Sequence, residues 1–294
     1  MTKGLVSIKR LLGSGAFFWR GTTMKIAIGI ALTALTVVSQ AQYAGDNASN
    51  APYVVGQEYI QVGTTAGDQT AATNGMNGGF GFEKWQRGGY GSPPNNGTTV
   101  ISNINASFGM GAQQFSMTSG ASGSEGADAR RRLLSDLPVG SVFSFSMMAG
   151  GNGAGRANTS GFWGVEMRSS LLSNPGRDIF GIYGGPSGNW SVEGAGAAQN
   201  SGIAVTAGQR LDVSILTTAA GAFSVTLTPA GGTGSTFAVN SISAGAYLRT
   251  AQFFVFGTNG DFYMNNLQAV PEPGTFVALG IGVLAIARRR RATR

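Results

Sequence analysis

Residues 210–228 read RLDVSILTTAAGAFSVTLT, and this stretch decides the fold class. Apolar and polar side chains alternate over 210–216 and again over 223–228, with small residues at 219–221 between the two runs. A period of two is the pattern of a strand that buries one face. Two such runs joined by a short turn containing glycine indicate an antiparallel hairpin.

The same alternation recurs through the middle of the chain. The other segments of strand length that carry it are 142–147, 162–167, 179–183, 190–193, 237–239, 252–256 and 261–267. Turn-forming Gly, Pro and Asn residues separate them. Because the strands are short and no amphipathic helix accompanies them, we predict an all-β domain, an antiparallel β-sandwich, over residues 42–270.

The positive charge of the chain lies at its two ends. The formal net charge is +7, but five of the 20 basic residues fall within 1–41 and five within 288–294. Residues 42–287 hold the other ten basic residues and all 13 acidic residues, which leaves this part net negative. A nucleic-acid surface requires a basic face on the folded domain. We therefore expect no nucleic-acid partner.

The N-terminal residues have the organisation of a secretory signal peptide. Lys25 precedes an uncharged apolar run, 26–38, and small residues stand at Ser39 and Ala41. This order of basic, apolar and small residues is that of a signal helix followed by a signal-peptidase site. We place cleavage between Ala41 and Gln42. Met24 is favoured as the start of translation, and residues 1–23 are either a mis-assigned upstream start or a long n-region of the signal peptide.

The C-terminal residues 271–294 form a second segment of distinct composition. Pro271, Glu272 and Pro273 come first, 275–287 are uncharged, and a basic cluster follows at Arg288, Arg289, Arg290 and Arg291. Thirteen helical residues span about 20 Å, which is short of the roughly 30 Å hydrocarbon core of a bilayer. The arginines would stay cytoplasmic, so the body would lie on the other side. We predict a short hydrophobic helix that anchors the chain temporarily.

This order of triplet, apolar segment and arginine cluster resembles the PEP-CTERM sorting signal of Gram-negative and related bacteria. The resemblance covers 271–294 and implies recognition by an exosortase, a membrane protease that removes the tail. It also implies an exported cell-envelope or extracellular-matrix protein, often made alongside exopolysaccharide. The expected route passes through the secretion machinery, with transient anchoring in the inner membrane and the body in the periplasm, to the cell surface or the medium.

The body has a second, looser resemblance. It is carried by Asp46-Asn47-Ala48, by residues 78–82 with Trp85, by the arginines at 130–132 and by the closing segment 261–267. In this order the segments resemble lectin-like sandwiches of the jelly-roll or concanavalin type found in PEP-CTERM proteins. The resemblance implies a fold and leaves the ligand open.

The absence of Cys and His limits the chemistry of the chain. Ser–His–Asp and Cys–His mechanisms and the usual zinc ligands are excluded. A glycosidase could still use two carboxylates about 5–9 Å apart, and the candidates are Glu58, Glu83, Glu166 and Glu193. Concanavalin-type glucanases carry acidic residues at positions i, i+2 and i+5 of one strand, and this chain has no such cluster. We predict a protein without catalytic residues and keep a sandwich-fold glycosidase as an alternative.

A carbohydrate-binding module is the other alternative. Trp163, Tyr183 and Trp190 could supply the aromatic faces that sugar sites use beside amides and carboxylates. The competing interpretation is that one face of each strand is core, so that these side chains point inward. Residues 130–132 are expected to splay to opposite faces of a solvated edge strand.

Metal and cofactor sites are not expected. Calcium prefers oxygen ligands, and a site would require the two ends of the domain to meet. In that case the candidate ligands are Asp46, Asn47, Asp261 and Asn266. Asx residues at turns serve more often as backbone caps, so we predict no metal centre and no cofactor.

Overall fold

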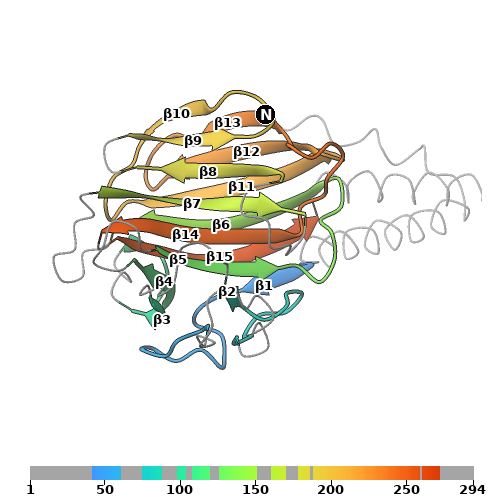
Figure 1. Ribbon diagram of the computed structural model, residues 1–294. Helices are drawn as coiled ribbons and strands as arrows, with labels where there is room; N and C mark the ends of the chain where they lie inside the picture. Colours follow the sequence, from blue (N-terminus) through green and yellow to red (C-terminus); the bar gives the residue numbers. More distant parts are fainter. Residues whose placement is uncertain are drawn as a thin grey trace, which may run out of the picture. The chain divides into compact units, whose positions relative to one another are not determined.

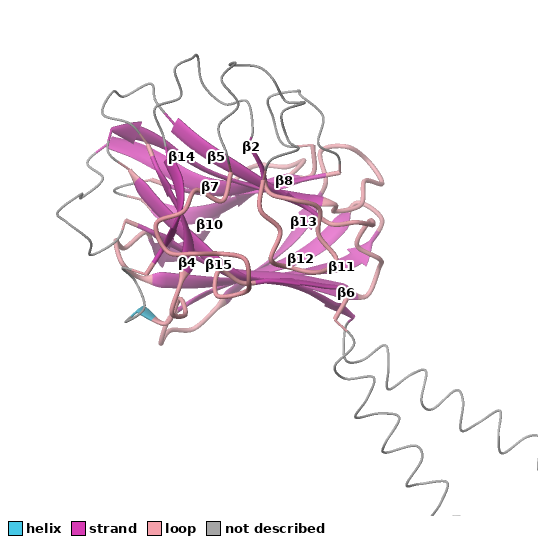
Figure 2. Ribbon diagram, turned by 90° about the horizontal axis from the view of Figure 1, so that it is seen from below, coloured by secondary structure: helices cyan, strands magenta, loops and turns pink. Residues whose placement is uncertain are grey.

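Two antiparallel sheets lie face to face in the computed structural model of the chain (Figures 1 and 2). The structure describes residues 42–60, 75–87, 98–103, 108–119, 126–150, 160–169, 178–185, 188–258 and 260–271. Residues Gln42–Pro271 form one compact unit. The predicted all-β antiparallel sandwich is therefore confirmed. The predicted signal helix and the short C-terminal helix lie outside the described residues.

Sheet I has the strand order β13-β12-β11-β6-β15-β4-β3, with β1 also paired to β15. Its strands are β1 (Ala44–Asp46), β3 (Thr98–Ser102), β4 (Gln114–Thr118), β6 (Ser141–Ala149), β11 (Arg210–Ala219), β12 (Ala222–Pro229), β13 (Ser235–Asn240) and β15 (Asp261–Pro271). The hairpin predicted from 210–228 is β11–β12. Ser214 pairs with Thr226 in it, and Gly221 takes a φ of 74° at its turn, a conformation that glycine adopts without strain.

Sheet II has the strand order β10-β9-β8-β7-β14-β5-β2. Its strands are β2 (Gln86–Arg87), β5 (Gly126–Arg132), β7 (Ser160–Arg168), β8 (Phe180–Gly184), β9 (Asn189–Glu193), β10 (Gln199–Ala204) and β14 (Thr250–Thr258). Each of the nine segments predicted as strands overlaps an observed strand. Strands β1 to β5 and β10 were not predicted.

The core lies between the two sheets and is built from alternate residues of each strand. Phe145 of sheet I meets Phe253 of sheet II edge to face, with ring centroids 5.1 Å apart. Val165 and Val255 of sheet II and Ile215 and Val225 of sheet I are also fully buried. Each such apolar side chain stabilises the fold by about 1.5–3 kcal/mol. Burial of alternate residues explains why the period of two predicted these strands.

Strand β15 occupies the middle of sheet I and changes partner along its length. Its first part pairs with β4 at 261–264, and its last part pairs with β1, where Ala269 lies opposite Ala44. The change occurs at a bulge, where Asn266 has a φ of 56°. Asn265 holds the bulge by donating to the carbonyls of Met110 and Gln113, at 2.6 and 2.7 Å. The first and last strands of the domain are therefore neighbours.

Candidate functional site

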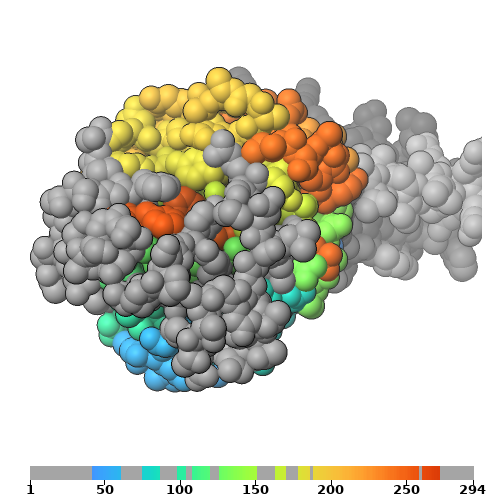
Figure 3. Space-filling view, in the orientation of Figure 1, coloured from blue at the N-terminus to red at the C-terminus, as the bar shows by residue number. Residues whose placement is uncertain are grey.

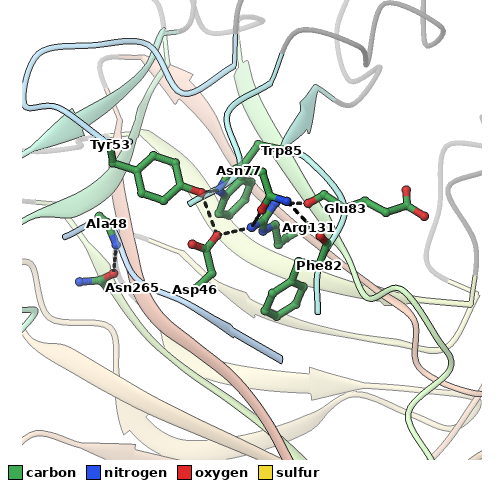
Figure 4. A network of polar contacts seen from close by, with 9 residues as sticks. All are labelled: Asp46, Ala48, Tyr53, Asn77, Phe82, Glu83, Trp85, Arg131 and Asn265. Atoms are coloured by element: carbon green, nitrogen blue, oxygen red, sulfur yellow. Dashed lines mark hydrogen bonds and ion pairs between the residues drawn. The ribbon is translucent and has the colours of Figure 1, made fainter. Parts of the chain in front are cut away.

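A network of buried polar side chains connects the two sheets (Figure 4). Asp46 ends β1 in sheet I, and its Oδ2 lies 2.7 Å from Nη2 of Arg131 on β5 of sheet II. The Tyr53 hydroxyl donates to the same carboxylate at 3.1 Å, and Trp85 Nε1 donates to the Tyr53 oxygen at 3.1 Å. Neither member of the ion pair has an exposed side chain. The network therefore cannot meet a ligand from solution.

The remaining contacts of Arg131 complete its enclosure. Its guanidinium lies over the rings of Phe82 and Trp85, with centroid distances of 5.0 and 5.2 Å. It also donates to Asn77 Oδ1 at 2.6 Å and to the carbonyl of Glu83. Burial raises the pKa of Asp46 and lowers the pKa of Arg131, because removal from water disfavours both charged forms. We assign this network a structural role.

A second set of polar residues lies on the outer face of sheet II, away from the core. One residue from each of six neighbouring strands forms a row across this face in register. The row reads Gln86, Arg130, Gln252, Glu166, Gly181 and Glu193. The alternation along each strand indicates which residues lie on this face. Successive side chains point to opposite faces, and residues one position away, such as Val165 and Phe253, belong to the core.

Gln252 is the centre of the row. Its Oε1 accepts hydrogen bonds from Arg130 Nε at 3.1 Å and from Arg168 Nη1 at 2.5 Å. Its Nε2 donates to Asp128 Oδ2 at 2.8 Å. All four side chains are buried although they point away from the core. Hydrogen bonds to charged groups in such surroundings fix the side chains in one arrangement.

Aromatic rings lie beside this polar row. The ring of Tyr183 is 5.9 Å from that of Phe254, which is 6.0 Å from that of Phe256. Two glycines make room for the rings. A Cβ at Gly181 would lie 2.2 Å from the Tyr183 hydroxyl, and a Cβ at Gly164 would lie 2.7 Å from the Phe254 ring. The Tyr183 and Phe254 rings therefore occupy the space that side chains at positions 181 and 164 would otherwise fill.

The accessible part of this face lies over β8 and β9. Tyr183, Ser191 and Glu193 are half-buried, and Asn189 is exposed. Glu166 borders them, and its Oε1 accepts a hydrogen bond from the Tyr183 hydroxyl at 3.3 Å. Residues of β9 and β10 (yellow) reach the surface in Figure 3. An aromatic ring beside two carboxylates and an amide is the combination that sugar sites use. We name Glu166, Tyr183, Asn189, Ser191 and Glu193 the outer-face site.

The structure does not bring the predicted aromatic platform together. Trp163 and Trp190 are each 3% exposed and belong to the core, and Trp163 Nε1 donates to the carbonyl of Asp261 at 2.8 Å. Tyr183 lies on the opposite face of the sheet. Trp163 shares its strand phase with Val165 and Met167, and this phase was the signal for its inward position.

The four carboxylates proposed for a glycosidase are divided between surfaces. Glu58 is exposed, and Glu83 forms an ion pair with Arg132 at 3.1 Å. Glu166 and Glu193 are in the same row, with Gly181 between them. Two strand spacings put their Cα atoms about 9–10 Å apart. The Tyr183 ring lies over Gly181 and so occupies the space between these two residues.

The two ends of the domain meet as the calcium hypothesis required, but the four oxygen donors do not converge. Asn47 Nδ2 donates to Asn266 Oδ1 at 2.6 Å. Asp46 faces Arg131 in the interior, and Asp261 accepts from Thr118 Oγ1 at 2.9 Å at the far end of β15. Within the described residues, no group of three or more acidic side chains could hold a metal ion.

The arginine run differs from its expectation in one respect. Arg131 points to the core while Arg130 and Arg132 point outward, so the predicted splay is observed. The predicted solvated edge is wrong, because β5 lies between β14 and β2 and Arg130 is 4% exposed. Burial of Arg131 is permitted by its ion pair with Asp46, and burial of Arg130 by its hydrogen bond to the Gln252 side chain.

The sorting residues lie at the border of the described structure. Pro271 is the last residue of β15 and pairs with Ser141. Glu272, Pro273, Arg288, Arg289, Arg290, Arg291 and Ala41 lie outside the described residues, and Gln42 is the first residue within them. In the part of the chain that the structure describes, no helix is long and apolar enough to cross a bilayer. The predicted tail span therefore stays a prediction.

Comparison with known proteins identifies the C-terminal segment. Residues 269–291 match the PEP-CTERM protein-sorting motif, so the chain carries this motif at the position that the sequence predicted. The motif implies an exported protein of the cell surface or the extracellular space. A search of curated proteins gives no match.

Solved structures similar to the chain include lectins and carbohydrate-active enzymes. Lectin II from Ulex europaeus is 9% identical, with 65% of this chain and 92% of that chain covered and a TM-score of 0.39. The T. cruzi calreticulin globular domain is 9% identical, with 69% and 95% covered and a TM-score of 0.42. A GH131 beta-glucanase catalytic domain from Podospora anserina is 16% identical, with 63% and 84% covered and a TM-score of 0.37. Similarity at this level says nothing about function.

Proposed function

We propose that this chain is an exported cell-envelope or extracellular-matrix protein that an exosortase processes at its C-terminal tail. The secretion machinery and a signal peptidase deliver residues 42–271, and the tail holds the protein in the inner membrane until it is cut. The observation that carries the proposal is the match to the sorting motif at 269–291. Its first residues are the end of β15, where Ala269 is fully buried between β1 and β6. The tail therefore begins where the folded domain ends.

The test is mass spectrometry of the protein recovered from the cell surface and the medium. We expect no peptide beyond the neighbourhood of 271–273 in wild type. The Glu272→Gln and Pro273→Ala variants, which leave the strands unchanged, should retain the tail and accumulate in the membrane fraction. The Ala197→Ser variant, in an exposed turn, is the matched control. Recovery of intact Arg294 from wild-type surface material would refute processing.

The second candidate function is non-enzymatic binding of exopolysaccharide at the outer-face site. The Tyr183 ring with Glu166 and Glu193 beside it is the observation that favours it. The ring would stack on a sugar. The carboxylates would accept hydrogen bonds from sugar hydroxyl groups, and the Asn189 amide nitrogen would donate one. Because the ring lies between the two carboxylates, binding is favoured over hydrolysis at this position.

Polysaccharide pull-down and a glycan array test this candidate. We expect saturable binding that the Tyr183→Ala variant weakens at least tenfold and the Tyr247→Ala variant leaves unchanged. Tyr247 is an exposed tyrosine that serves as the matched control. Absence of saturable binding by wild type would leave a structural matrix role. Release of reducing sugar that the Glu193→Gln variant abolishes would replace binding by glycoside hydrolysis.

A further inference from the structure

Exposed apolar side chains are unevenly distributed over the domain. Among the described residues, eight large apolar side chains are exposed, and six of them lie at one end of the sandwich. We name these six the apolar end; they are Tyr43, Phe80, Leu134, Val139, Ile242 and Tyr247, and they are 37–60% exposed. Single exposed apolar residues are ordinary on a protein surface, but segregation to one end requires an explanation.

Three members of the apolar end surround the beginning of β1. The Tyr43 amide donates to the carbonyl of Ala269 at 2.7 Å, only two residues before β15 ends. Phe80 exchanges two backbone hydrogen bonds of 3.0 Å with Gly45. The Leu134 amide donates to Gly81 at 3.0 Å, which places it beside Phe80.

The other three members lie across the same end of sheet I. Ser141 pairs with Pro271, the last residue of β15, and Val139 lies two residues before Ser141. The Leu137 amide donates to Leu248 at 2.9 Å, next to Tyr247. Ser241, next to Ile242, donates to Gly221 in the β11–β12 turn. The orange segment around residues 240–250 marks this part of the end in Figures 1 and 3.

The covalent connection fixes how far the apolar end can lie from a tail inserted in a membrane. The apolar tail segment begins at Thr275, four residues after Pro271. A fully extended chain advances at most about 3.6 Å per residue, so the connection spans no more than about 14 Å. Since β15 ends at the apolar end, the C-terminus of β15 would lie within about 14 Å of the point where an inserted tail enters the bilayer.

We propose that the apolar end is a membrane-contact surface that rests on the lipid headgroup region while the tail is inserted. This inference rests on the proposed membrane insertion of the tail. Tyrosines favour the membrane–water interface, because their rings are apolar and their hydroxyls remain hydrated. Two tyrosines and four other apolar side chains, facing a bilayer that the short connection keeps close, match that environment.

The two remaining exposed apolar residues, Val54 and Val55, provide an internal control. They precede Gly56, whose amide donates to Ile101. Ile101 pairs with Phe115, which pairs with Met264, seven residues before Pro271. This level of the sheet lies about 23 Å from the end of β15. Val54 should therefore stay in water when the apolar end contacts lipid.

The experiment uses the full chain reconstituted in phosphatidylcholine vesicles. Because the chain has no cysteine, single Leu134→Cys, Tyr247→Cys, Val54→Cys and Leu284→Cys variants each accept one nitroxide spin label. Collision with oxygen, which concentrates in lipid, is compared with collision with a water-soluble nickel complex. We expect labels at 134 and 247 to show at least threefold higher oxygen-to-nickel collision ratios than the label at 54.

The label at 284 separates the two proposals. Membrane contact would be overturned if the labels at 134 and 247 gave the same ratio as the label at 54. A ratio typical of the bilayer interior at 284 in the same experiment would leave anchoring intact. A water-exposed label at 284 would overturn the anchoring on which the inference rests. Shielding of 134 and 247 from both oxygen and nickel, with spin–spin broadening, would show that a second copy covers the surface and would also overturn it.

Discussion

The Asp46 carboxylate and the Arg131 guanidinium form a 2.7 Å ion pair in which neither side chain is exposed. Asp46 belongs to the first strand of sheet I, and Arg131 belongs to sheet II. The pair therefore fastens the N-terminal segment of the domain to the opposite sheet. Desolvation makes a buried pair a poor source of net stability, but removal of one partner leaves a buried charge uncompensated.

Replacement of Arg131 should be among the most destabilising single changes in the domain. The Arg131→Met variant leaves the Asp46 carboxylate buried without its cation, at an expected cost of about 3–5 kcal/mol in the free energy of unfolding. Urea denaturation followed by tryptophan fluorescence measures it, since Trp85 contacts the guanidinium. The Arg132→Met control removes a partly exposed pair with Glu83 and should cost about 1 kcal/mol or less. Equal effects of the two variants would contradict the assignment.

The pH dependence of stability should report on Asp46. Burial raises the pKa of this carboxyl above its ordinary value near 3.8, so the folded protein holds the proton more tightly than the unfolded chain. The stability that Asp46 contributes is therefore largest below pH 3.8 and falls as the pH rises through the raised pKa. The stability of wild type minus that of the Asp46→Asn variant should decrease from pH 3 upward and then level off. A difference that grows with pH would show that the Arg131 charge outweighs burial.

Gly181 should resist enlargement because the Tyr183 ring fills its space. The Gly181→Ala variant places a methyl group 2.2 Å from the Tyr183 hydroxyl, with an expected cost of about 1–3 kcal/mol. The double variant with Tyr183→Ala should recover most of the loss. Gly188→Ala, where a Cβ meets nothing within 4 Å, should change stability by no more than about 0.5 kcal/mol. Thermal unfolding monitored by circular dichroism compares the four proteins.

Alanine variants at Trp163 and Tyr183 should distinguish a core residue that stabilises the fold from a surface residue available to a ligand. The Trp163→Ala variant opens a cavity in the core and loses a buried hydrogen bond, at a cost of about 3–5 kcal/mol. The Tyr183→Ala variant, at a half-buried position, should cost about 1–2 kcal/mol. Calorimetry gives both values. A mild effect at Trp163 would return this residue to consideration as part of a binding surface.

The bulge in β15 should depend on the residue type at 266. Asn266 has a φ of 56°, and its side chain accepts a hydrogen bond from Asn47. The Asn266→Gly and Asn266→Ala variants both lose this bond, but only alanine is strained in the left-handed region. Alanine should therefore be less stable than glycine by about 1 kcal/mol in urea denaturation. Equal stability would mean that the bulge relaxes.

The sequence predicted those strands in which apolar residues alternate with polar ones, because this pattern follows directly from burial of one face. Strand β5 was missed because its inward positions carry Ala127, Ala129 and Arg131. Arginine appears inward only because Asp46, 85 residues earlier in the chain, meets it in the fold. No local pattern carries that information.

The outer-face site was predictable only in part. Tyr183, Glu166 and Glu193 were all named as candidates from residue type, but their combination depends on register. The row across sheet II joins strands whose order, β9-β8-β7-β14-β5-β2, is not their order in the chain. Residue types and strand phase can be read from sequence, whereas the neighbours of each strand require the fold.

The central place of β15 in sheet I has a consequence for the timing of folding during export. Sheet I cannot close until residues 261–271 have emerged from the secretion channel, because β6, β4 and β1 all pair with them. The sorting segment follows these residues directly in the chain. Late, long-range pairing of this kind is slow compared with local contacts. With the tail inserted as we propose, the domain would complete its fold after the tail reaches the membrane, on a chain that is already tethered.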